Sequence, residues 1–130
     1  MKILIAEDDE LLRALLADFV SELGHEVKSA ENGLELVKLA MAERPDLIIT
    51  DLHMPEMEGS SMIAMLDLYP PLTGMPVIVI SRATSSEIAD MGIPVEIPIL
   101  PKPFDFGRIT AEVERVAHKN EHETGQNTCR

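Results

Sequence analysis

Three short runs of apolar residues predict the buried strands of this chain. They cover residues 3–6, 47–50 and 77–80, are rich in isoleucine and valine, and are bounded by polar or turn residues. Continuous apolar runs of this length are typical of parallel strands that are covered on both faces. Residues 25–30 alternate loosely and predict another strand. Pro98 and Pro101 interrupt the strand-like residues 95–100, so a strand there should be short and lie at a sheet edge.

Helical periodicity connects these runs. Leucine, valine and phenylalanine recur at helical spacing over residues 11–23 and stop at Gly24, where a helix is often followed by glycine. Asn32 is expected to cap a second helix that ends before Pro45. Weaker patterns predict three more helices, over residues 57–68, over about 85–91, and over a final segment that carries Phe104, Ile109, Val113 and Val116.

The alternation of strands and helices predicts an α/β fold. We expect a flavodoxin-like, doubly wound parallel sheet of five strands in the order 2-1-3-4-5, with helices on both faces and right-handed crossovers. The chain has 130 residues, which is room for one such domain. From about Lys119 the sequence is polar and lacks apolar periodicity. We therefore expect a domain over residues 1–118 and a disordered polar tail over residues 119–130.

Charge and composition exclude several functions. The 23 acidic and 11 basic side chains give a formal charge of −12, which argues against direct binding to nucleic acid or to an anionic membrane. Cys129 is the sole cysteine, so the chain can form no internal disulfide, and the first apolar run is too short for a signal peptide or a spanning helix. A cytoplasmic location is expected.

Acidic residues follow two of the predicted strands. Glu7 and Asp8 come after the first apolar run, and Asp51 follows residues 47–50. Because ligands bind beyond the carboxyl ends of parallel strands, at the point where the winding direction switches, these carboxylates should converge. Together they would repel unless a cation binds, and oxygen ligands favour Mg²⁺. Capping a helix is the competing explanation, which suits Asp8 or Asp9 better than Asp51, since Pro55 delays any helix.

Two further polar residues lie at the same predicted edge. Lys102 stands between Pro101 and Pro103, which restrict its backbone, and Ser81 follows the run over residues 77–80. Each has an ordinary explanation, an exposed loop lysine and a turn serine. Beside the acidic cluster they complete a set suited to phosphoryl transfer, in which Asp51 is the nucleophile and Lys102 neutralises oxygens of the transferred group.

Over residues 2–118 the chain resembles the receiver domains of two-component response regulators. The resemblance rests on the sequence ILIAEDD at residues 3–9, on DLHMPEMEG at residues 51–59, on Ser81, and on KPF at residues 102–104. It implies that Asp51 is the phosphoacceptor, that Ser81 hydrogen-bonds the phosphoryl group, and that Lys102 pairs with it. It also implies a Mg²⁺ site whose protein ligands are Glu7, Asp8, Asp51 and the backbone carbonyl of His53.

The resemblance further implies a signalling switch of a two-component phosphorelay. Such a domain accepts a phosphoryl group from a phosphohistidine of a sensor histidine kinase or a phosphotransfer protein. It catalyses only its own phosphorylation and dephosphorylation, and is otherwise no enzyme. It then presents an altered face, made by the fourth helix, fifth strand and fifth helix, to a downstream protein that the sequence does not identify. A monomer or weak dimer is expected.

Two positions depart from the family pattern. The family usually has a small residue after the hydroxyl position, where this chain has Arg82, and often has an aromatic three residues before the lysine, where this chain has Ile99. These departures leave open a receiver-like interaction domain that phosphate does not control. A small Mg²⁺-dependent aspartyl phosphohydrolase is the third hypothesis. It would lack its second acid, because His53 lies two residues after Asp51, and the chain has no room for a cap domain.

Overall fold

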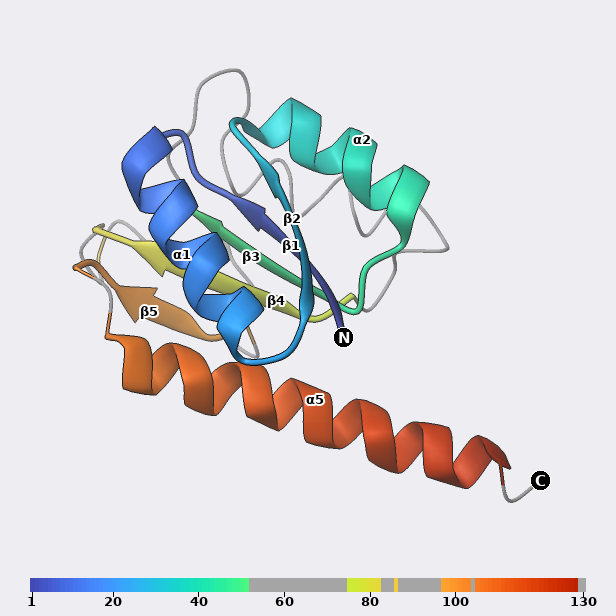
Figure 1. Cartoon of the computed structure of the whole chain (residues 1–130). Helices are drawn as coiled ribbons and strands as arrows, with labels where there is room; N and C mark the ends of the chain where they lie inside the picture. Colours follow the sequence, from blue (N-terminus) through green and yellow to red (C-terminus); the bar gives the residue numbers. More distant parts are fainter. Residues whose placement is uncertain (52–74, 83–85, 87–96, 104, 129–130) are drawn as a thin grey trace.

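A five-stranded parallel sheet forms the centre of the part of the chain that the structure describes (Figure 1). This computed structural model describes residues 1–51, 75–82, 86, 97–103 and 105–128, with side chains through Lys119. The strands are β1 (Lys2–Ala6), β2 (Glu26–Ala30), β3 (Leu47–Asp51), β4 (Val77–Ser81) and β5 (Ile99–Pro101). Their order is β2-β1-β3-β4-β5 and every pair is parallel, which confirms the predicted fold class.

Helices cover both faces of this sheet (Figure 1). Helix α1 (Glu10–Glu22) and helix α5 (Phe106–Thr128) lie on one face, and helix α2 (Gly33–Glu43) lies on the other. The rings of Phe19 and Phe106 pack with their centroids 4.4 Å apart, which joins α1 to the start of α5. The apolar strands β1, β3 and β4 are therefore shielded from water on both sides, whereas β2 at the sheet edge is largely exposed.

Alternate strand residues enter two separate cores. In β1, Ile3 and Ile5 pack toward α1 and α5, whereas Leu4 and Ala6 pack toward α2. The first core also contains Leu16, Val20, Leu47, Ile49, Ile78, Ile80, Leu100, Ile109, Val113 and Val116. The second also contains Ala30, Leu36, Val37, Ala40, Ile48, Val77 and Val79. Burial on both faces explains why β1, β3 and β4 are almost continuously apolar.

Side chains cap the N-termini of α1 and α2, and a glycine follows the C-terminus of α1, as predicted. Asp9 Oδ1 accepts the backbone N–H of Leu12 at 3.0 Å and caps α1, while Gly24, just beyond its C-terminus, has a φ of +99°. Asn32 Oδ1 accepts the backbone N–H of Glu35 at 2.8 Å and caps α2, as predicted. Asp9 is thus the helix cap, so capping does not account for Asp8.

Removing the cap of α2 should weaken the fold. Asn32→Ala is expected to lower the free energy of unfolding by about 1 kcal/mol, because the first turn loses an acceptor for one of its unpaired N–H groups. Urea denaturation measures this difference. Asn32→Asp keeps the acceptor and should stay close to wild type, and an alanine variant as stable as the aspartate variant would contradict the role of the cap.

The remaining elements match their predictions to different degrees. Strand β5 is three residues long and lies at the sheet edge, as its prolines predict. Helix α5 instead continues through Thr128, so it includes most of the segment expected to be a disordered tail. The domain boundary at His118 stays a prediction. The third predicted helix lies outside the described residues, as does most of the fourth.

Candidate functional site

The carboxyl ends of adjacent strands position the polar residues singled out from the sequence. Glu7 and Asp8 directly follow β1, Asp51 ends β3, and Ser81 ends β4. Because β3 lies between β1 and β4, these residues share one edge of the sheet. Lys102 follows β5 at the same edge, and its backbone N–H donates to the Ser81 carbonyl at 3.0 Å. The structure therefore brings these five predicted residues together.

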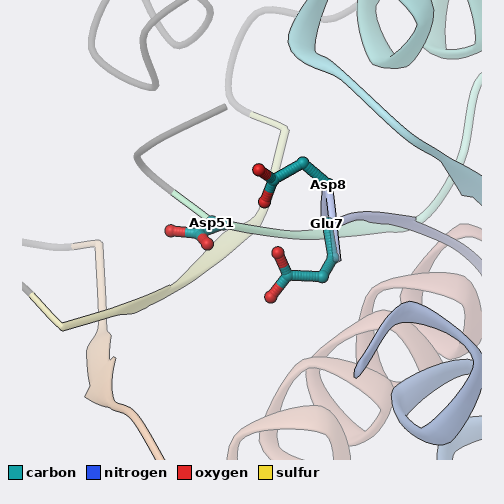
Figure 2. Close-up of side chains that lie close together, drawn as sticks. All are labelled: Glu7, Asp8 and Asp51. Atoms are coloured by element: carbon teal, nitrogen blue, oxygen red, sulfur yellow. The ribbon is translucent and has the colours of Figure 1, made fainter. Parts of the chain in front are cut away.

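Three carboxylate groups converge beyond the ends of β1 and β3 (Figure 2). Glu7, Asp8 and Asp51 each offer one oxygen, and these oxygens all lie within 4.8 Å of one another. Glu7 and Asp51 are buried, whereas Asp8 is exposed. Ionised carboxylates this close repel one another, and the repulsion is stronger where water is excluded. The cluster is therefore stable in its ionised form only with cations nearby.

Lys102 supplies one such partner. Its Nζ donates to Glu7 Oε1 at 2.5 Å and to Asp51 Oδ2 at 2.6 Å, and its side chain is only 7% exposed. Burial alone would lower the pKa of Lys102, but the bonds to Asp51 and Glu7 outweigh it and raise this pKa above its usual value. Lys102 therefore stays an ammonium ion at neutral pH. Burial raises the pKa of Glu7, and Lys102 partly opposes that rise.

The loop between β1 and α1 is held by contacts that sequence reasoning missed. Arg13 Nη1, on the first turns of α1, donates to the backbone carbonyl of Glu7 at 2.9 Å. The backbone N–H of Asp9 donates to Glu7 Oε2 at 3.3 Å. These bonds hold the carbonyl and the carboxylate of Glu7 against the start of the helix. The sequence does show a basic residue, Arg13, early in the helix that follows the acids. Its contact with the Glu7 carbonyl could not be predicted, because it depends on the conformation of the loop.

A cleft of about 280 Å³ contains the cluster. It is lined by Glu7, Asp8, Asp9, Leu12, Asp51, Arg82 and Lys102. Ser81 is buried and is not among these lining residues, and Arg82 is exposed. His53, whose backbone carbonyl was expected to be a metal ligand, lies outside the described residues. Within the cleft, Asp8 is exposed to solvent, whereas Glu7, Asp51 and the side chain of Lys102 are buried.

The donor set suits a hard divalent cation. Carboxylate oxygens are the ligands that Mg²⁺ and Ca²⁺ prefer, and Mg²⁺ typically keeps several waters while one or two carboxylates hold it. One exposed and two buried carboxylates meet this requirement, with Asp8 facing the solvent from which a hydrated ion would arrive. The residues present therefore fit a magnesium-type site.

The sequence of this chain matches the model of the response regulator receiver domain over residues 3–114. The chain belongs to this family. Receiver domains are signalling domains that interact with histidine kinases and with downstream effectors. The predicted family is thereby confirmed.

Relatives of known function and structure agree with this membership. The DNA-binding transcriptional regulator NtrC of Azospirillum brasilense is 34% identical over 122 residues, which cover 91% of this chain and 24% of that regulator. The polar-differentiation response regulator DivK of Brucella anthropi is 37% identical over 79 residues, 61% of this chain and 64% of that protein. The chain thus spans less than two thirds of each relative's length.

The fold is also that of solved receiver structures. The chemotaxis protein CheY4 of Vibrio cholerae superposes with a TM-score of 0.80 at 28% identity, covering 88% of this chain and 97% of that chain. Among the described helices of this receiver domain, none combines the length and apolar character needed to cross a membrane.

Proposed function

We propose that this receiver domain is a phosphorylation-dependent switch of a two-component phosphorelay. Asp51 accepts a phosphoryl group from a phosphohistidine on a sensor histidine kinase or a phosphotransfer protein. The modified domain then binds a downstream protein through an altered output face. In this proposal it is a cytoplasmic monomer or weak dimer that catalyses only its own phosphorylation and dephosphorylation.

One observation carries the proposal: a buried ammonium group is held against the carboxylate that would be modified. Lys102 Nζ lies 2.6 Å from Asp51 Oδ2, inside a cleft that also holds Glu7 and Asp8. A purely structural ion pair needs no open cleft and no additional acids. An aspartyl nucleophile needs both, because the phosphoryl group must enter and its charge must be neutralised.

In the proposed transfer step, Asp51, Lys102 and Ser81 have separate roles. A carboxylate oxygen of Asp51 forms a bond to phosphorus as the N–P bond of the phosphohistidine breaks, and the electron pair of that bond stays with the imidazole nitrogen. Lys102 pairs with one oxygen of the transferred group, and the Ser81 hydroxyl donates a hydrogen bond to another. These residues position and neutralise the group, which is most of what phosphoryl transfer requires of a protein.

The proposed cofactor is Mg²⁺, held by Glu7, Asp8, Asp51 and the backbone carbonyl of His53. When bound, it would neutralise negative charge on the oxygens of the transferred group. Asp8 has the clearest separate role, because Glu7 and Asp51 also bond Lys102 whereas Asp8 faces solvent. We infer that Asp8 would be the solvent-facing ligand of the ion and that Glu7 and Asp51 would be its buried ligands.

Intact-mass analysis with acetyl phosphate tests the function without a known kinase. Wild-type protein in Mg²⁺ should gain a single phosphoryl group, and protein treated with EDTA should gain none. The same donor in Mg²⁺ giving no adduct, although calorimetry shows that the ion binds, would favour the interaction domain that phosphate does not control.

Replacing Asp8 should separate metal binding from folding. Asp8→Asn is expected to weaken Mg²⁺ binding at least about tenfold, because a charged oxygen ligand is lost, while the domain stays folded. Titration calorimetry with Mg²⁺ measures the affinity. Asp9→Asn is the matched control, since asparagine still caps α1. Equal affinities in the two variants would remove Asp8 from the site.

A further inference from the structure

Arg82 is the cation among the described lining residues of the cleft that the proposed transfer step does not use. It directly follows Ser81, the last residue of β4. The residue before Ser81, Ile80, pairs in register with Asp51, and the Ser81 carbonyl accepts the backbone N–H of Lys102. The backbone that carries Arg82 is therefore anchored to both central residues of the site.

The two cations among the described residues of the cleft differ in their surroundings. Lys102 is buried and its ammonium group is bonded to Glu7 and Asp51, so its charge is largely neutralised within the cluster. Arg82 is exposed at the mouth. An exposed guanidinium presents a planar fork of N–H donors that matches the oxygens of a phosphoryl group. Arg82 is thus placed to meet an anion before Lys102 does.

The charge of the cleft makes such a contact valuable. Among the described residues, four carboxylates line it, those of Glu7, Asp8, Asp9 and Asp51, together with the two cations. A phosphodonor carries negative charge, so the acidic cleft repels it, and a cation at the mouth reduces that repulsion. The same cation repels Mg²⁺. Arg82 should therefore act in opposite directions on the two species that the site must gather.

We propose that Arg82 is a specificity-determining residue that contacts the anionic oxygens of the phosphodonor at the mouth of the cleft. It speeds capture of small anionic donors and weakens binding of Mg²⁺. This inference rests on the proposed function, because it assigns Arg82 a part in the reaction of Asp51.

The test measures two quantities on Arg82→Ala and Arg82→Lys. For Arg82→Ala, the second-order rate of adduct formation from acetyl phosphate at saturating Mg²⁺ should fall by about fivefold to tenfold at low ionic strength. Its affinity for Mg²⁺ alone, measured by calorimetry, should rise by about twofold to fivefold. Arg82→Lys keeps the charge and should restore most of both values. The difference in rate between wild type and Arg82→Ala should become smaller as salt is added, because Arg82 is exposed and salt screens its charge.

The outcomes separate this inference from the proposed function. If rate and Mg²⁺ affinity fall together in Arg82→Ala, the residue has a structural role and the inference is overturned. The inference is also overturned if Arg82→Ala reacts at the wild-type rate. If wild-type protein itself forms no adduct, the proposed function fails and the inference falls with it.

Discussion

The variant Asp51→Asn is expected to form no phosphoryl adduct with acetyl phosphate and Mg²⁺ under conditions that modify the wild-type protein. An amide is a far weaker nucleophile than a carboxylate. Among the described residues, Glu7 is the other acid that is bonded to Lys102. The fold should survive, because asparagine has the same shape and its amide oxygen can still accept from the lysine. Intact-mass analysis reads the outcome directly.

Asp18→Asn provides the matched control for this loss. Asp18 is exposed on α1 and does not line the cleft, so the same chemical change there should leave adduct formation unaltered. Wild-type levels of adduct in Asp51→Asn would place the acceptor elsewhere and refute the proposed mechanism.

Replacing Lys102 should have the largest effect on stability. Lys102→Met keeps most of the side-chain volume but leaves the buried carboxylates of Glu7 and Asp51 without their cation. Removing one partner of a buried ion pair typically costs about 3–5 kcal/mol, so we expect a loss of about 3 kcal/mol in the free energy of unfolding in EDTA. Mg²⁺ should recover part of this loss, because it binds only the folded cluster.

An exposed ion pair of the same length serves as the control. Lys28 Nζ lies 2.6 Å from Glu43 Oε1, but the Lys28 side chain is 46% exposed, so water screens the pair. Lys28→Met should therefore change the denaturation midpoint far less than Lys102→Met. Similar midpoints for the two variants, or a Lys102→Met variant that Mg²⁺ does not stabilise, would show that the buried lysine is not compensating the acidic cluster.

Elements whose own residues carry an apolar run or a limiting proline were predictable from the sequence. The strands β1, β3 and β4 are apolar because both sheet faces are covered, and the short edge strand β5 is limited by prolines. The extent of α5 was not predictable in the same way. Residues 119–128 carry no apolar stripe, so nothing in their pattern distinguishes a helix from a polar tail. A wholly polar segment can continue a helix that packing nucleates further upstream.

The candidate site was predictable as a set of residues but not as a network. Strand-end positions placed Glu7, Asp51 and Lys102 at one edge, because parallel strands bring their carboxyl ends together. The Lys102 ammonium group donates to both buried acids, Glu7 and Asp51. This pair of bonds depends on side-chain conformations that the spacing of residues along the sequence does not encode. The bond from Arg13 to the Glu7 carbonyl depends on the shape of the β1–α1 loop in the same way.

The site of phosphorylation on the wild-type chain tests the central claim most directly. Protein modified with acetyl phosphate in Mg²⁺ would be reduced with borohydride, which converts an aspartyl phosphate to homoserine, and the peptides would then be sequenced by mass spectrometry. We predict homoserine at position 51 and at no other position. Homoserine at position 8, or a stable phosphate on a serine or histidine with Asp51 unchanged, would contradict the account.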